Sequence, residues 1–290
     1  MLKNTFHHLP GIGALTERQI WSAGILAWDD FKEPNPLKWS SARTAACRVG
    51  LQTSQKYLLD NHPGYFTGHL PSSQHWRIFP EFRNTTAYLD IETTGMDPYD
   101  QSITTIALYD GRSVFYYIAG QNLERFKSDI TRYGLIVTYN GKCFDIPFVE
   151  KDLNIRLPQA HIDLRYVLAG LGITGGLKRC EAKLGLARGD LAGVDGFFAV
   201  LLWNEYRQYK NTKALQTLLA YNIQDAVNLE TLMVMAYNLK IKETPFASSH
   251  RMDLTPIPTV PFNPDPPTIA QIKQRYTFGN HFQGYNPTRG

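Results

Sequence analysis

Apolar and polar positions alternate with two different periods between residues 85 and 240, and together they predict a mixed α/β region. Short apolar runs predict five strands: 86–91, 103–109, 114–118, 135–139 and 160–164. Apolar residues spaced by three and four predict the helices: 122–132, one from about 144, then about 165–171, 177–185, 196–209 and 212–239. Three strands in hairpin order, followed by helices that alternate with two more strands, predict a mixed sheet flanked by helices.

The residues on either side of this region follow other patterns. Residues 1–60 predict a small helical element, which includes a helix at 40–59. Residues 61–84 carry glycine and proline among aromatic residues, so we predict an irregular linker that packs on the next domain. Residues 241–290 are rich in proline, and we expect an extended or mobile tail there.

Composition narrows the class of protein. The 290 residues are 43% hydrophobic and 19% charged, which is ordinary for a soluble globular protein. No apolar run approaches the ~20 residues that cross a bilayer, and the first residues lack the order of a signal peptide. Three widely separated cysteines without a CxxC pair predict neither a zinc site nor a disulfide framework. We therefore expect a cytoplasmic protein with no membrane partner.

The stretch Ala87-Tyr-Leu-Asp-Ile-Glu-Thr-Thr-Gly95 places two acids in an apolar strand. Residues i and i+2 of a strand point to the same face, so Asp90 and Glu92 project side by side. Adjacent carboxylates repel each other and lose hydration when buried, and a divalent cation between them removes both penalties. Ligands that are all oxygen suit Mg²⁺ or Mn²⁺. The alternative is a strand end that carries two solvated acids.

Two further acidic motifs follow along the chain. In Tyr139-Asn-Gly-Lys-Cys-Phe-Asp145 the last residue lies in the first turn of a helix, where the helix dipole alone would also favour an acid. In Tyr221-Asn-Ile-Gln-Asp225 the tyrosine and the aspartate share one face of a helix. A surface or interface pair would explain this motif as well.

The three motifs, in this order, resemble those of the DEDDy group of DnaQ-like 3′–5′ exonucleases. The wording Asp-Ile-Glu-Thr-Thr-Gly and Tyr-Asn-Gly-Lys-Cys-Phe-Asp-Ile-Pro looks closest to the YprB-like branch, which is predicted to be related to the exonuclease domain of family B DNA polymerases. The resemblance covers about residues 86–240. It implies a ribonuclease H-like fold and metal-dependent 3′–5′ exonuclease activity on single-stranded ends of DNA or RNA.

The resemblance also implies roles for individual residues. Two divalent ions, Mg²⁺ or Mn²⁺, would be held by four carboxylates: Asp90, Glu92, Asp145 and Asp225. Tyr221 matches the tyrosine that helps to position or deprotonate the attacking water. Thr93 and Thr94 would back the terminal nucleotide, and Asn140 would hydrogen-bond near it.

Other polar residues near these motifs have less specific interpretations. Asp163 also occurs at this place in the family, and we interpret it as a residue that supports the site rather than as a metal ligand. Lys142 and Lys178 are candidates for phosphate contacts, although exposed lysines usually only keep a surface soluble. His161 is interpreted as a core or surface histidine, because hard-metal sites prefer oxygen.

Near the N-terminus, Pro10-Gly-Ile-Gly13 opens a helix and resembles the hairpin of helix-hairpin-helix elements. In that family the turn offers backbone N–H groups to a phosphate of nucleic acid, which makes Gly11 and Gly13 candidate substrate contacts. The alternative is a helical cap whose glycines only make a turn.

Two other functions remain open at this point. One is a nucleic-acid-binding module that keeps the fold without catalysis. The other is a ribonuclease H-like endonuclease. The presence of all five motif residues argues against the first, and the tyrosine motif argues against the second.

Overall fold

A five-stranded mixed sheet lies at the centre of the structure. The computed structural model describes residues 1–34, 36–95, 101–191 and 193–282. The strands are β1 (Thr86–Thr93), β2 (Ile103–Tyr109), β3 (Val114–Ile118), β4 (Leu135–Thr138) and β5 (Ala160–Asp163). Their order is β3-β2-β1-β4-β5, antiparallel among β1, β2 and β3 and parallel from β1 to β4 and from β4 to β5. The predicted fold class, a mixed α/β sheet flanked by helices, is confirmed.

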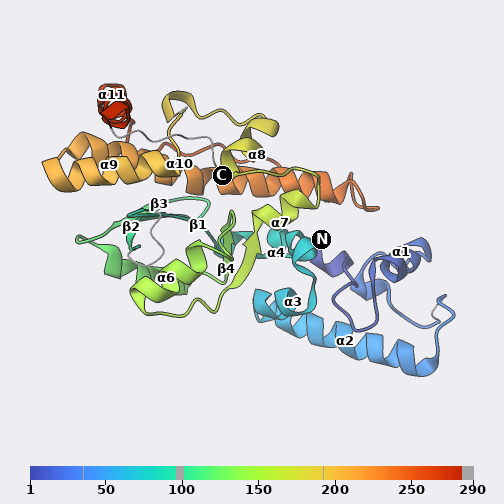
Figure 1. The fold of residues 1–290 in the computed structure, drawn as a ribbon. Helices are drawn as coiled ribbons and strands as arrows, with labels where there is room; N and C mark the ends of the chain where they lie inside the picture. Colours follow the sequence, from blue (N-terminus) through green and yellow to red (C-terminus); the bar gives the residue numbers. More distant parts are fainter. Residues whose placement is uncertain (35, 96–100, 192, 283–290) are drawn as a thin grey trace.

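Helices cover both faces of this sheet (Figure 1). The α-helices are α1 (Ala14–Ser22), α2 (Ser41–Leu59), α3 (Pro63–His69), α4 (Phe79–Phe82), α5 (Phe126–Asp129), α6 (Asp145–Leu153), α7 (Leu164–Ala169), α8 (Leu177–Lys183), α9 (Gly196–Tyr209), α10 (Thr212–Ile241) and α11 (Pro266–Phe282). In Figure 1, α9 and α10 lie along one face and α6 lies on the other. Each helix in the described part of the chain is too short or too polar to span a membrane.

The central strand is buried on both sides, which explains its nearly continuous apolar sequence. Tyr88 packs in the hydrophobic cluster that includes α10, whereas Leu89 and Ile91 pack in the cluster that includes α6. Side chains alternate along a strand, so Asp90 and Glu92 share the face of Tyr88 and point toward α10.

The segment before β1 differs from the prediction of an irregular linker. It consists of α3, a 3-10 helix at Ser72–Ile78 and α4. The aromatic side chains of Phe66, Trp76, Phe79 and Phe82 are buried there. Glycine and proline usually interrupt helices, which is why the sequence predicts an irregular segment. Proline is tolerated in the first turn of a helix, however, and both α3 and α4 have a proline there. The packing of this segment on the sheet domain is confirmed.

The tail agrees in part with the extended chain that its prolines predict: residues 251–260 have no regular secondary structure, whereas Pro266–Phe282 form α11. Pro266 and Pro267 open α11, because the first residues of a helix need no hydrogen bond from their N–H groups. The Asp265 carboxylate accepts hydrogen bonds from the Thr268 N–H at 3.1 Å and from the Thr268 hydroxyl at 2.6 Å. The predicted helix at 122–132 is likewise altered, since it is divided into 3-10, α and 3-10 turns.

The N-terminal helical region shares its hydrophobic core with the sheet. Glu17 of α1 is buried in an ion pair with Arg77, with 2.9 Å between Oε2 and Nη2. Helix α2 occupies the range predicted for it, and the Ser40 hydroxyl accepts a hydrogen bond from the Arg43 N–H at its start. The turn at residues 10–13 precedes α1, but the described chain before that turn holds only a 3-10 helix, Leu2–Asn4. The hairpin is therefore flanked by an α-helix on one side only.

Candidate active site

The first two acids of the site lie at the carboxyl end of the central strand. Asp90 pairs across the sheet with Ala107, and Glu92 pairs with Thr105. Both neighbours on β2 are small and fully buried. β1 and β4 are parallel, so the turn that follows β4 lies at the same edge of the sheet. The strand pattern predicts this side-by-side arrangement correctly.

Helix α10 brings a third carboxylate to the same place. One oxygen each from Asp90, Glu92 and Asp225 lie within 4.8 Å of one another, a cluster found among the described residues. Asn222, three residues before Asp225 on α10, donates a hydrogen bond from Nδ2 to Asp90 Oδ2 at 2.6 Å. Asp90, Glu92 and Asp225 are called the acidic cluster below.

Asp145 lies beside this cluster but is not one of its three members. It is the first residue of α6, and its Oδ1 accepts a hydrogen bond from the Ile91 N–H at 3.2 Å. Ile91 is the residue between the two acids of β1, so Asp145 fixes α6 next to them. Burial raises the pKa of Asp145 to about 7.

The charges of the acidic cluster are poorly compensated. Burial, and then the charge of Asp225, raise the pKa of both Asp90 and Glu92 well above the usual range. Burial also raises the pKa of Asp225, to about 6, although the nearby Arg188 opposes this rise. Buried carboxylates that converge with oxygen donors alone match the preference of a hard divalent cation. The residues present therefore fit a hard divalent cation.

Arg188 is a residue of the site that sequence reasoning missed. Its Nη1 lies 2.6 Å from Asp225 Oδ1, and its Nη2 lies 2.5 Å from Glu181 Oε2. The other Glu181 oxygen accepts a hydrogen bond from Asn228 Nδ2 at 2.7 Å. The short segment Gly185-Leu-Ala-Arg-Gly189 has no periodicity that would indicate this role, so no local signal could have found it.

Tyr221 lies one helical turn before Asp225, as the i, i+4 spacing predicts. Lys178 Nζ is 4.6 Å from the centre of its ring, and Arg188 Cζ is 5.8 Å from the same centre. Burial and the charge of Asp225 raise the pKa of the Tyr221 hydroxyl. The hydroxyl is therefore protonated at neutral pH.

Asp163 stabilises the turn after β4 by hydrogen bonds to its backbone. Its two carboxylate oxygens accept hydrogen bonds from the N–H groups of Asn140 at 2.8 Å and Lys142 at 3.1 Å. Asn140 adopts a positive φ of 66°, and its Oδ1 accepts a hydrogen bond from Arg165 Nη1 at 2.5 Å. The interpretation of Asp163 as a supporting residue fits this geometry.

Three other predicted residues have definite positions near the site. His161 Nε2 lies 2.8 Å from the Thr138 hydroxyl, and burial lowers its pKa to about 4, in keeping with a structural histidine. The Thr94 hydroxyl accepts a hydrogen bond from the Ser102 N–H at 3.1 Å, and Thr93 is buried at the end of β1. These contacts fix the backbone directly after the two acids of β1.

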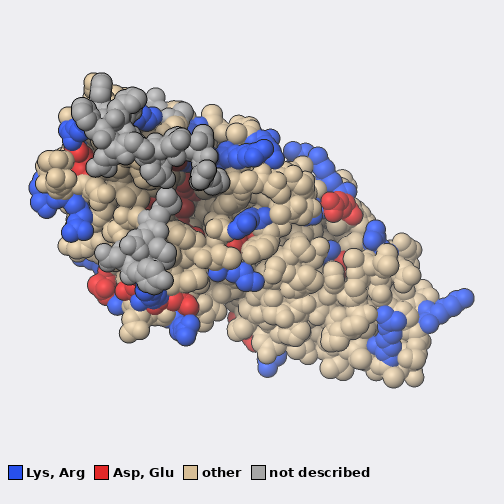
Figure 2. Space-filling view, viewed as in Figure 1, with Lys and Arg blue, Asp and Glu red and all other residues tan. Residues whose placement is uncertain are grey.

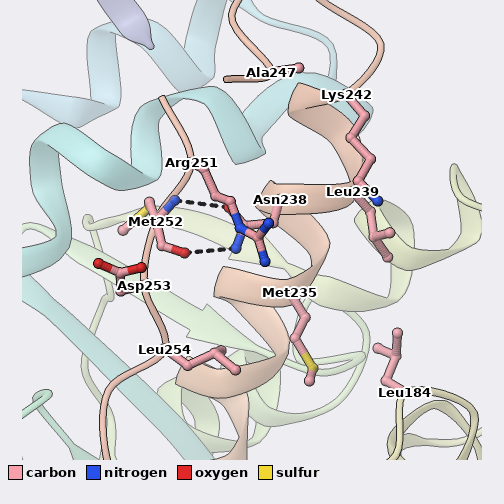
Figure 3. Close-up of a pocket in the computed structure, with 10 residues that line it drawn as sticks. All are labelled: Leu184, Met235, Asn238, Leu239, Lys242, Ala247, Arg251, Met252, Asp253 and Leu254. Atoms are coloured by element: carbon pink, nitrogen blue, oxygen red, sulfur yellow. Dashed lines mark hydrogen bonds between the residues drawn. The ribbon is translucent and has the colours of Figure 1, made fainter. Parts of the chain in front are cut away.

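Basic side chains gather over α8 beside a hollow in the molecular surface (Figure 2). The sequence of α8 contains three basic residues, Lys178, Arg179 and Lys183. Another cavity, of about 420 Å³, lies between the end of α10 and residues 247–254 (Figure 3). None of the three carboxylates of the acidic cluster lines it, and in it the Asn238 side chain exchanges hydrogen bonds of 2.8 and 2.9 Å with the Met252 backbone. That cavity is separate from the site.

Gly11 and Gly13 lie in the turn before α1, at the opposite end of the molecule from β2 and β3 (Figure 1). Gly11 has a φ of 73°, whereas Gly13 has the ordinary extended backbone of a helix N-cap. A Cβ atom at either residue would meet no atom within 4 Å. No contact joins this turn to the acidic cluster among the residues that the structure describes.

Comparison with known proteins places this site in a family. A family model described as the RNase_H superfamily matches residues 87–237, just over half of the 290 residues. Among solved structures, the family B DNA polymerase from the hyperthermophilic archaeon Pyrobaculum calidifontis is similar, with 17% sequence identity and a TM-score of 0.34. That similarity covers 54% of this chain and 29% of the polymerase chain, so this chain spans less than a third of the polymerase. A search of curated proteins finds no match.

Proposed function

Since the chain belongs to the RNase H superfamily, we propose that it is a metal-dependent nuclease. More specifically, we propose a YprB-like 3′–5′ exonuclease of the DEDDy type that acts on single-stranded ends of DNA or RNA. The observation that carries this proposal is the acidic cluster on β1 and α10, with Tyr221 one turn away from Asp225 on the same helix.

In this proposal each residue has a distinct task. Asp90, Glu92 and Asp225 hold the divalent ions, Mg²⁺ or Mn²⁺, and Asp145 completes the set beside Ile91. When bound, two such ions activate a water molecule and stabilise the charge that develops on the departing 3′ oxygen. Tyr221 orients the attacking water through its protonated hydroxyl.

The substrate contacts are part of the same proposal. Thr93, Thr94 and Asn140 would position the terminal nucleotide, and Lys142 would contact a phosphate. Gly11 and Gly13 would bind a more distant phosphate through backbone N–H groups at the start of α1.

Arg188 keeps the charge of Asp225 partly compensated before the ions bind.

The test is a product analysis on matched DNA and RNA oligonucleotides labelled at the 5′ or the 3′ end. We expect hydrolysis that needs Mg²⁺ or Mn²⁺, disappears with EDTA and shortens the strand from its 3′ end. Asp90→Asn should remove nearly all activity, because it deletes a charge that the ions require. Asp60→Asn, which changes an exposed acid at the end of α2, is the matched control and should leave activity unchanged.

A covalently closed single-stranded circle separates the remaining alternatives. An exonuclease leaves the circle intact, so cleavage of the circle would identify an endonuclease instead. If folded wild-type protein binds the oligonucleotides but hydrolyses none of them with either ion, the protein is a binding module without catalysis.

A further inference from the structure

We propose that a groove along the edge strand β5, facing α3, binds the single strand of nucleic acid that leads to the acidic cluster. This proposal rests on the nuclease function proposed above and names the path of its substrate. β5 is the last strand of the sheet, and α3 and the 3-10 helix Ser72–Ile78 pack against it. The groove is called the β5 groove below.

The β5 groove consists of two adjoining cavities of about 360 and 520 Å³. The two share four lining residues, so they form one continuous hollow: Gly64, Pro158, Gln159 and Ala160. Cavities of this size hold small ligands such as a nucleotide. The N-terminal region, through α3, thus forms one wall of the groove and the sheet domain forms the other.

One end of the β5 groove reaches the turn that follows β4. Lys142, Asp163 and Tyr166 line this end. Asp163 also accepts a hydrogen bond from the backbone N–H of Asn140, the residue proposed to contact the terminal nucleotide. The end of the groove therefore adjoins that contact. On the other side of the same turn lies a third hollow, of about 650 Å³, lined by Asn140 among others. The turn that carries Asn140 therefore has a hollow on each side, and the path proposed for the strand crosses this turn.

The side chains at this end have the chemistry that single-stranded nucleic acid needs. The exposed Lys142 has its Nζ 5.9 Å from the ring centre of Tyr166, a residue that is 39% exposed. An exposed aromatic ring beside a cation offers a stacking surface for a base and a charge for a phosphate. Among the described residues that line the groove, Asp163 is the one acid, and its carboxylate already accepts hydrogen bonds from backbone N–H groups.

Gln159 lies where the two cavities of the groove meet. Gln159 lines both cavities, and its Nε2 donates a hydrogen bond to the Ile130 carbonyl at 3.1 Å. Its Oε1 is buried without a hydrogen-bond partner. The bases of a duplex are paired and cannot enter such cavities, so the groove selects a single strand.

The experiment uses the full-length protein and a fluorescent 12-nucleotide single strand. Gly68 lines the groove on α3, and a Cβ atom there would meet no atom within 4 Å, so longer side chains fit without disturbing the fold. Gly68→Glu introduces a negative charge into the path, whereas Gly68→Gln has the same shape and no charge. We expect Gly68→Glu to weaken binding about 5- to 10-fold relative to Gly68→Gln, the scale of one like charge near a phosphate.

Tyr166→Ala provides an independent measurement. We expect it to weaken binding of the 12-nucleotide strand about 5- to 100-fold, the scale of one base stacked on an aromatic ring. Hydrolysis of a dinucleotide, which occupies only the end of the groove beside Asn140, should remain at the wild-type rate in Gly68→Glu. Arg112→Gln, on the exposed turn between β2 and β3 at the other end of the strands, controls for a general change of charge.

The outcomes separate this proposal from the nuclease function. If Gly68→Glu and Tyr166→Ala bind the 12-nucleotide strand as the wild type does, the groove is not the path, whether or not the protein is a nuclease. If both weaken binding but the wild type hydrolyses nothing, the groove proposal stands and the catalytic proposal fails. A wild-type protein that does not bind single strands at all overturns the groove proposal as well.

Discussion

Arg188 shows how one side chain adjusts the charge of the site. It lies between Asp225 and Glu181 with only 9% of its side chain exposed, and both carboxylates are buried more deeply. One buried cation thus compensates two buried anions. Removing one partner of a buried ion pair is strongly destabilising, because the other charge is left without compensation. The same charge opposes a second cation that approaches Asp225.

We therefore expect Arg188→Gln to lower the melting temperature of the metal-free protein and to enlarge the stabilisation by Mn²⁺. In this variant, a bound cation neutralises the charge of Asp225 that Arg188 neutralises in the wild type. The measurement is thermal unfolding over a series of Mn²⁺ concentrations, which gives the affinity without any assay of activity. Arg83→Gln breaks the ion pair of 2.8 Å with Glu230 and is the matched control. An equal Mn²⁺ shift in both variants would contradict this role of Arg188.

At the scale of elements, the site depends on how β4 is joined to α6. The turn between them carries Asn140 and ends at Asp145, so its path sets the distance between two parts of the site. Gly141 lies in this turn, and a Cβ atom there would come within 2.2 Å of the Thr138 hydroxyl and 2.5 Å of Thr138 Cβ. The close approach of this backbone to β4 is possible only without a side chain.

We predict that Gly141→Ala moves the turn and lowers nuclease activity about tenfold or more, since displacements of about 1 Å have effects on this scale. The overpacking should also reduce the free energy of unfolding by about 1–3 kcal/mol. Gly196→Ala, at the start of α9, adds the same methyl group where no atom lies within 4 Å. Hydrolysis rates and urea unfolding of the two variants are compared. Wild-type activity in Gly141→Ala would show that the turn is free to adjust.

At the scale of the whole molecule, a buried histidine joins the N-terminal region to α3, in the segment before β1. The ring of His8 contacts those of Trp28 and Phe66, with centres 5.5 and 5.7 Å away, and its Nε2 lies 2.8 Å from the Ser54 hydroxyl. Burial lowers the pKa of His8 to about 3. The folded state therefore disfavours the protonated ring, and stability is lost as the pH falls below the ordinary histidine value of about 6.5.

Protonation of His8 in the unfolded state should therefore lower the free energy of unfolding of the wild type as the pH falls. The loss is about 1.36 kcal/mol per pH unit below about 6.5, which gives up to about 2 kcal/mol between pH 7 and pH 5. In His8→Gln the side chain keeps a polar group for Ser54 but does not titrate, so the loss over this range should be smaller. Urea unfolding at both pH values measures the difference. His62→Gln changes an exposed histidine and is the control. A pH dependence in His8→Gln as steep as that of the wild type would exclude His8 as the source.

The sequence by itself determined the features that repeat with the period of the backbone. The strands at 103–109 and 114–118 and the helix at 196–209 have the predicted bounds, because local spacing of apolar residues sets them. The same period placed Asp90 beside Glu92 on one face of β1, and Tyr221 one turn from Asp225 on α10. These relations are fixed within a few residues, so no knowledge of distant parts of the chain was needed.

The tertiary structure alone decided the contacts between segments that are distant in the sequence. Arg188 and Asp225 are 37 residues apart and meet only because the segment after α8 packs on α10. The β5 groove exists because α3 covers the edge of the sheet, a segment in which glycine and proline suggested an irregular linker. Ion pairs and cavities depend on distances through space between such segments, and the order of residues along one segment carries no signal for them.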